Sequence, residues 1–298
     1  MKRRGSTHSR KITLAGVVLL LLMPPRPLLA QPTPAANSAF RAYAQVVESR
    51  LARQHQSGNT FLALAAPDPV SEAKRLRNGE LEIEQLTPSA GAELSGSLLH
   101  HWRGTAFVPG AKAGDFERLT QDFKSYPQHF SPQVLQARLI GQNGDRMQAW
   151  MRVRQQHLVP VVLDTTYDIT YGRLDEQHGY SISRSTRIAE IYAAGTAGER
   201  ALNADEEHGF LWRLNTYWSY EEKDGGLYLQ IEAVSLTRSI PHALGWVIRP
   251  YVESIPRDSL KFTLRSVCNA LRKQPKQLSP SIERTERCIS KQLQHTTQ

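Results

Sequence analysis

The chain of 298 residues has only two cysteines, Cys268 and Cys288, and no recognisable metal-binding pattern. Its ten histidines have neither partners at helical i, i+4 spacing nor the Cys/His spacing of zinc sites. A nucleophile elbow of the Gly-x-Ser-x-Gly type is also missing, because the segment 179–183 reads GYSIS and lies within a strand pattern. We therefore expect no metal, no cofactor and no catalytic residue of these kinds.

Long hydrophobic runs are scarce, and the one near the N-terminus covers only residues 12–23. A transmembrane helix needs about 20 apolar residues to cross the bilayer, so this run is too short. Basic residues precede it and the helix breakers Pro24 and Pro25 follow it, which is the order of a secretory signal. We expect a signal peptide at residues 1–30 and a mature chain that begins near Gln31. It would be periplasmic or secreted in a bacterium and would not be an integral membrane protein.

The formal net charge of +9 is concentrated at the two ends of the sequence. Residues 1–30 carry six basic and no acidic residues, and residues 272–298 carry six basic and two acidic residues. Removing these +6 and +4 contributions leaves −1 for residues 31–271. Without a basic patch in the folded part, binding to nucleic acid is not expected. Residues 273–298 are predicted to form a polar, basic tail.

The expected mature chain begins with helices and continues with strands. Residues 31–37 have the composition of a linker, and helices are predicted at 38–57 and 68–78. Residues 31–79 are therefore predicted to form a linker and flanking helices, the first with Phe40, Tyr43, Val47 and Leu51 on one face. A further helix is predicted at 115–124. Strands are predicted at 80–85, 97–108, 134–140, 147–154, 161–171, 180–191, 210–221 and 227–237.

The last six predicted strands form three hairpins, for which Asn143-Gly144 and the segment 223–226 supply turn residues. A long amphipathic helix follows at 241–271, and Pro256 is expected to kink or split it. Such a helix needs a sheet on which to bury its apolar residues. The predicted fold class is α+β, with a curved antiparallel β-sheet wrapped around a long C-terminal helix and extra helices at the N-terminus.

Several short motifs resemble a known superfamily. The segment 123–134, with Tyr126-Pro127, is similar to the link between first helix and next strand in the START-like (SRPBCC, polyketide cyclase and lipid transport) superfamily. The segments 209–215, 232–238 and 255–260 resemble a subgroup of secreted bacterial proteins within it. The resemblance implies a helix-grip domain at 80–272. It also implies an apolar or amphipathic ligand, a hydrophobic small molecule or lipid, in a cavity between the sheet and the C-terminal helix.

A polar set on the later strands is the main candidate for ligand contact. Arg213, Asn215 and Tyr217 share one face of their strand, because successive residues alternate between faces. On a concave face they would orient a ligand head group, whereas on a convex face they would form surface ion pairs of little energetic value. The candidate aromatic residues could equally be core residues. The candidate ligand-binding residues are Trp150, Tyr167, Arg184, Arg187, Arg213, Asn215, Tyr217, Glu232, Trp246 and Tyr251.

The two cysteines are expected to form a disulfide in an oxidising compartment, closing a loop of about twenty residues. The alternative is two free thiols, with Cys268 buried as a small apolar residue beside the helix stripe.

The leading functional hypothesis is an exported soluble binding protein for a hydrophobic or lipid-like small molecule. One alternative is a cyclase-like or hydratase-like enzyme that uses Arg213, Tyr217 and Glu232 as acid, base and orienting group. The other is a protein-interaction module of the cell envelope that uses the acidic loop near residue 205 or the basic tail.

Overall fold

The computed structural model describes residues 31–64, 68–87, 92–94, 96–156, 160–239 and 245–273. At 92–93, 156 and 245–253 the description covers the backbone alone. The predicted signal peptide and the basic tail lie outside the described residues. No helix in the described part of the chain is long and apolar enough to span a membrane.

One curved antiparallel sheet forms the centre of the molecule. Eight strands follow one another in the order β1-β3-β10-β9-β7-β6-β5-β4, while the short strands β2 and β8 pair with β3 and β7. The strands are β1 (Glu82–Gln85), β2 (Ala92–Leu94), β3 (Ser97–Pro109), β4 (Val134–Asn143), β5 (Arg146–Gln156), β6 (Pro160–Arg173), β7 (His178–Tyr192), β8 (Arg200–Ala201), β9 (Arg213–Lys223) and β10 (Gly226–Arg238).

The three predicted hairpins, β4–β5, β6–β7 and β9–β10, are confirmed. In the turn between β9 and β10 both Asp224 and Gly225 have positive φ angles, 55° and 74°, which is the conformation that suits a two-residue hairpin. Strand β9 begins at Arg213 and not at Phe210 as predicted. The carboxylate of Glu190 accepts hydrogen bonds from the backbone N–H groups of His208, Gly209 and Phe210, and these residues therefore do not join the sheet.

The helices are α1 (Pro34–Gln54), α2 (Pro69–Arg77), α3 (Ala113–Gln121), α4 (Tyr126–His129) and α5 (Gly245–Lys273). Helix α1 begins one turn before the predicted start, because Pro34 occupies its first turn and Thr33 Oγ1 accepts a hydrogen bond from Ala36 N at 3.0 Å. Of the two effects expected of Pro256, a kink or a split, the split does not occur. Helix α5 is continuous, and the burial of Leu260 and Leu264 on the sheet offsets the backbone hydrogen bond that the proline removes.

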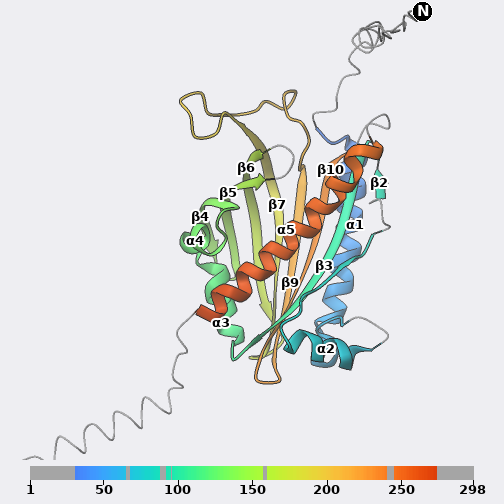
Figure 1. Cartoon of the computed structure of the whole chain (residues 1–298), viewed down its shortest axis with the longest axis vertical. Helices are drawn as coiled ribbons and strands as arrows, with labels where there is room; N and C mark the ends of the chain where they lie inside the picture. The colour runs from blue at the N-terminus through green and yellow to red at the C-terminus, as the bar shows by residue number, and fades with distance from the viewer. Residues whose placement is uncertain are drawn as a thin grey trace, which may run out of the picture.

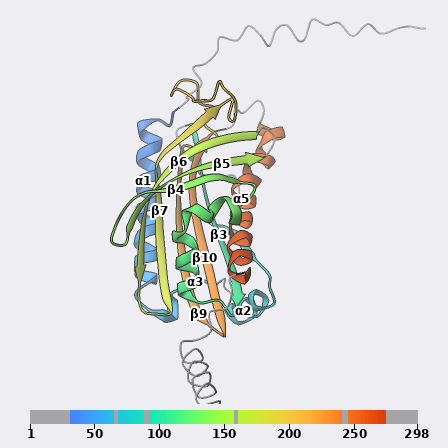
Figure 2. The same cartoon turned by 90° about the vertical axis from the view of Figure 1, so that its left-hand side faces the viewer.

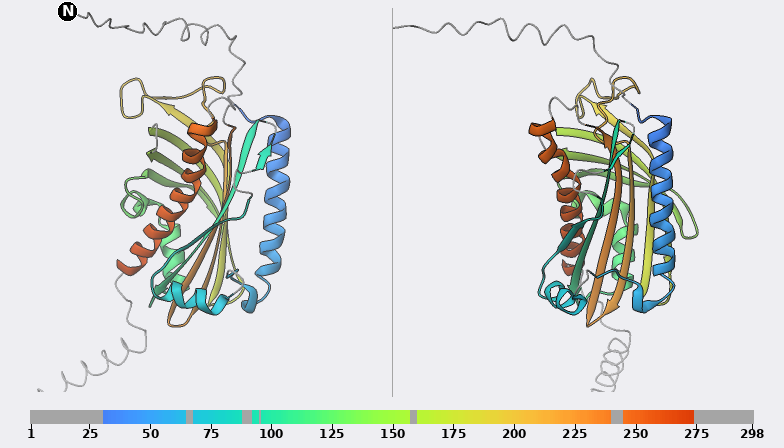
Figure 3. Two further views of the ribbon diagram at one scale, coloured as in Figure 1. Left: turned by 45° about the vertical axis from the view of Figure 1, so that its right-hand side comes forward. Right: turned by 90° about the vertical axis from the view of Figure 1, so that its right-hand side faces the viewer.

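The two long helices cover opposite faces of the sheet (Figures 1, 2 and 3). We call the face toward α5 the inner face and the face toward α1 the outer face. The inner core contains Trp102, Ala106, Trp218, Tyr220, Leu229, Ile231, Leu260, Leu264, Val267 and Leu271. The outer core contains Phe40, Val47, Leu51, Leu99, Trp212, Tyr217, Val234 and Leu236. The fold is thus the predicted α+β helix-grip fold, with α1 as a third layer on the outer face.

Candidate functional site

The inner face changes character along the strands. In the half covered by the C-terminal part of α5 it consists of large buried residues, among them Trp218 and Ile231. One step further along the sheet, Ser183, Thr216 and Ala233 lie side by side on strands β7, β9 and β10. These three side chains are small and only half-buried, although they occupy central strands. We call them the small-residue strip.

Two buried nitrogen atoms lie beside this strip. Trp102 pairs in register with Ala233, and His100 pairs with Ser235 on the same strand. Neither His100 Nδ1 nor Trp102 Nε1 has a hydrogen-bond partner among the described residues. Burial lowers the pKa of His100 from 6.5 to about 4, so the ring is neutral at pH 7. Neutral groups of this kind can orient a polar atom of a bound molecule.

The predicted aromatic ligand contacts are divided between the two faces. Tyr167 lies on the inner face, packed with Met147 and Ile169, and burial raises the pKa of Tyr167 to about 12. Trp150 lies on the other face, where the guanidinium of Arg138 stacks 4.5 Å from the centre of its ring. Trp246 and Tyr251 are residues of α5 whose side chains are outside the described part.

The predicted polar set lies mainly on the outer face, beneath α1. The arrangement differs from both alternatives that the sequence left open, because the outer face carries a helix that covers most of this set from solvent. Asn215, Tyr217 and Glu232 are buried, and Arg184 and Arg213 are half-buried. Arg187 is exposed.

Glu48 of α1 joins one part of this set. Its carboxylate accepts hydrogen bonds from Arg184 Nε at 2.7 Å, from Arg184 Nη2 at 2.8 Å and from the Tyr217 hydroxyl at 3.2 Å. Asn215 Nδ2 in turn donates to the Tyr217 hydroxyl. Burial raises the pKa of Tyr217, which therefore remains a neutral donor. Arg213 is held separately, by a hydrogen bond from Nη1 to the carbonyl oxygen of Trp212 at 2.7 Å.

Glu232 is the centre of a second polar cluster. Its Oε2 accepts hydrogen bonds from Arg50 of α1 and from His101 Nε2, the latter at 2.8 Å. His101 Nδ1 lies 3.0 Å from the hydroxyl of Tyr43, also on α1. Burial alone would raise the pKa of Glu232, but hydrogen bonding and charge from His101 and Arg50 outweigh this effect and lower it.

Sequence reasoning missed Tyr43, Arg50 and His101, because the first helix was interpreted as flanking. A signal was present in their spacing. Tyr43 and Arg50 are seven residues apart and share a helix face, and His101 and Arg103 alternate with apolar residues on β3.

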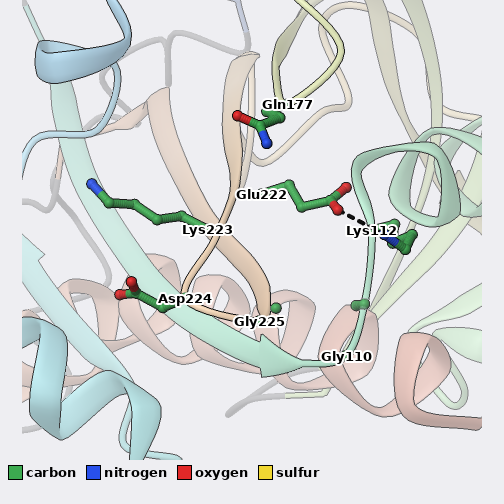
Figure 4. A pocket seen from close by; sticks show the side chains of 9 residues that line it. Gly110, Lys112, Gln177, Glu222, Lys223, Asp224 and Gly225 are labelled. Carbon is green, nitrogen blue, oxygen red and sulfur yellow. Dashed lines mark hydrogen bonds and ion pairs between the residues drawn. The ribbon is translucent and has the colours of Figure 1, made fainter.

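Two hollows in the described part of the chain lie away from the inner face. A hollow of about 320 Å³ is found at the β9–β10 turn, where Lys112 Nζ and Glu222 Oε1 form an ion pair at 2.9 Å (Figure 4). Asp224 at the same hollow is paired with Arg77, so these charged groups are already neutralised. A larger hollow, of about 520 Å³, lies between α1 and β3. No group of residues that could hold a metal ion is found in the described part of the chain.

Comparison with known proteins gives similarity in structure alone, since neither a family model nor a curated protein matches the sequence. A STAR-related lipid transfer protein from Xanthomonas axonopodis is 17% identical, with 64% of this chain and 99% of that chain covered and a TM-score of 0.39. The Zhui aromatase/cyclase from Streptomyces sp. R1128 is 13% identical, with 59% and 95% covered and a TM-score of 0.41. Human STARD10 is 9% identical, with 71% and 82% covered and a TM-score of 0.40.

The START-like resemblance expected from the sequence is thus found among solved structures, while the secreted subgroup is not among these three. With TM-scores of 0.39 to 0.41, these similarities do not bear on the ligand or reaction of this chain. The function has to be argued from its own residues.

Proposed function

We propose that the chain is an exported binding protein that holds a hydrophobic or lipid-like small molecule between the inner face of the sheet and α5. The observation that carries the proposal is the small-residue strip. Ser183, Thr216 and Ala233 occupy the middle of the sheet, one row from the large side chains of Trp218 and Ile231, yet they remain half-buried. Small side chains at such a position are expected where a bound molecule completes the packing, because unfilled volume in a core is destabilising.

The surroundings of the strip match an amphipathic ligand. Tyr167 and Met151 contribute apolar surface on the inner face. His100 Nδ1 and Trp102 Nε1 are buried there without hydrogen-bond partners among the described residues. Binding sites for small molecules are commonly built in this way, from an apolar wall with a few polar groups that fix the orientation.

The enzyme alternative has less support from the geometry. Its acid–base set, Arg213, Tyr217 and Glu232, faces α1 and is occupied by contacts with Glu48, Arg50 and the backbone. The interaction-module alternative relied partly on the acidic loop, in which Glu206 is paired with Arg200 at 2.7 Å. The acid–base set and Glu206 would have to lose these bonds to meet a substrate or a partner.

A titration of the delipidated mature protein with palmitate and with an isoprenoid quinone tests the proposal. Trp102 and Trp218 adjoin the strip, so their fluorescence should change on saturable binding. The substitution Ala233→Trp should fill the space and abolish that binding, while Ala201→Trp on the exposed strand β8 should leave it unchanged. Equal binding by both variants would refute the proposed position, and no binding of any apolar ligand would refute the function.

Export is tested separately. Cell fractionation and N-terminal sequencing should find a mature chain that begins near Gln31 in the periplasm or the medium. An intact chain starting at Met1 in the cytosol would contradict export and would leave the ligand proposal untouched.

A further inference from the structure

The hollow between α1 and β3 contains chemistry that the proposed function does not use. Helix α1 runs along the outer face beside β2 and β3 (Figure 3), and the space of about 520 Å³ opens between them. We call this space the α1–β3 groove. It lies on the opposite face of the sheet from the small-residue strip, so an inference about it does not depend on the function proposed above.

Three arginines line the groove, and one of them is unpaired. Arg103 Nε donates to Glu84 Oε1 at 2.6 Å, and Arg103 Nη1 lies 3.7 Å from Glu232 Oε1. Arg50 is paired with Oε2 of the same Glu232. Arg53 is exposed, and its guanidinium has no ion pair or hydrogen bond with any residue in the described part of the chain. Three guanidinium groups thus meet two carboxylates, which leaves a surplus of one positive charge.

The other wall of the groove is apolar. Val46 of α1 is 68% exposed although it lies one turn from Arg50, and Leu86 and Ala63 are half-buried on the facing segments. Removing an exposed valine from water is favourable, by about 25 cal/mol for each Å² of apolar surface covered. An apolar wall beside an unpaired guanidinium is suited to a molecule with an anionic head and an apolar body.

The floor of the groove is rigid and polar. His101 is held between Glu232 Oε2 and the Tyr43 hydroxyl, at 2.8 Å and 3.0 Å. Burial, followed by the charge of Glu232, raises the pKa of Tyr43, so its hydroxyl stays protonated. Glu232 also fixes the position of Arg50, and its Oε1 is buried without a hydrogen-bond partner among the described residues. These contacts position Arg50 before any ligand arrives, which reduces the entropy lost when a ligand binds to it.

We propose that the α1–β3 groove is a second binding site, for a small amphiphilic monocarboxylate. Its carboxylate pairs with the fork of Arg53 and with Arg50 at the rim, and its apolar body lies along Val46 and Leu86. The planar fork of a guanidinium matches the two oxygens of a carboxylate. A monoanion neutralises the surplus charge of the groove, whereas a doubly charged phosphate would leave an excess negative charge beside Glu232 and Glu84.

Calorimetric titration of the mature chain with decanoate tests this site, with decan-1-ol as the apolar probe without charge. Arg53→Gln should weaken decanoate binding about tenfold, the usual effect of losing one charged hydrogen-bonded contact. Arg53→Lys should recover only part of the affinity, because it restores the charge but not the fork. Val46→Asn should weaken decanoate and leave acetate unaffected. Arg41→Gln, an equally exposed arginine on α1, is the matched control and should bind decanoate as the wild type does.

The Ala233→Trp variant separates this site from the inner face. Decanoate binding that is retained in Ala233→Trp and weakened by Arg53→Gln supports the groove. Wild-type affinity in Arg53→Gln would overturn the proposal. In Ala233→Trp, decan-1-ol binding as tight as decanoate binding would overturn it too, as would the loss of all decanoate binding.

Discussion

The wild-type protein should lose stability in acid because of His100. Replacing His100 by leucine should remove this loss. The side chain is fully buried, and its one polar contact is between Nε2 and Thr237 Oγ1 at 3.3 Å. Burial lowers its pKa from 6.5 to about 4, because a protonated ring cannot be hydrated at this position. Below pH 6.5 the unfolded chain therefore binds a proton that the folded chain does not accept until about pH 4.

The sign and the size of the effect follow from these two values. The folded-state pKa lies below the unfolded-state value, so the contribution of neutral His100 is fully present above pH 6.5 and is lost as the pH falls toward 4. One pKa unit corresponds to about 1.4 kcal/mol, so the wild type should lose about 2 kcal/mol at pH 5 and about 3 kcal/mol at pH 4 through this residue. The variant His100→Leu lacks this loss.

Urea unfolding followed by circular dichroism, between about pH 7.5 and pH 4.5, measures the difference between the two proteins. The free energy of unfolding of His100→Leu, minus that of the wild type, should rise steadily as the pH falls. Leu236→Ala is the control, because Leu236 is equally buried and has no titratable group, and its deficit should not vary with pH. If the difference between His100→Leu and wild type stays constant over this range, burial of a neutral imidazole is not the cause of any acid sensitivity.

Three further outcomes are expected. Leu264→Ala should lower the free energy of unfolding by about 3 kcal/mol in urea titrations, because Leu264 is fully buried between α5 and the sheet; a loss below about 1 kcal/mol would mean that this contact is loose. Glu232→Gln should lower the free energy of unfolding by about 3 kcal/mol at neutral pH. Because the pKa of Glu232 is lowered from 4.5, this loss should shrink as the pH falls below that value, and a loss independent of pH would contradict the ion pairs. Thiol counting on the unfolded, unreduced protein should find no reactive thiol if Cys268 and Cys288 are bridged, and two reactive thiols would refute the bridge.

The parts of the fold that could be predicted are those with local causes. Alternation of apolar and polar residues, together with turns such as Asn143-Gly144, determines a hairpin within about twenty residues of chain. The apolar stripes on α5 likewise predict a helix that must be buried. The start of β9 could not be predicted, because the group that captures the amides of 208–210 is Glu190, on a different strand.

The candidate site was harder to predict, for a physical reason. A strand that alternates Arg213, Asn215 and Tyr217 with less polar residues looks the same whether its polar side meets water or a polar helix. The choice depends on Glu48 and Arg50, more than 150 residues earlier in the chain, whose charges complement that side. Local patterns therefore identify which residues share a face but not what covers it.

The carboxylate of Glu190 has a consequence for the long connection between β7 and β9. By accepting hydrogen bonds from three successive amides and from His208 Nδ1, it clamps the two ends of the excursion that runs through 193–207 to each other. The loop is thereby closed at its base, so a change in its length need not shift the pairing of the strands on either side. A peptide tag or a small reporter domain inserted at the exposed residues 203–205 would lengthen only this closed loop and leave the register of β7 and β9 unchanged, and it would keep clear of Glu199, which pairs with Arg152 of β5.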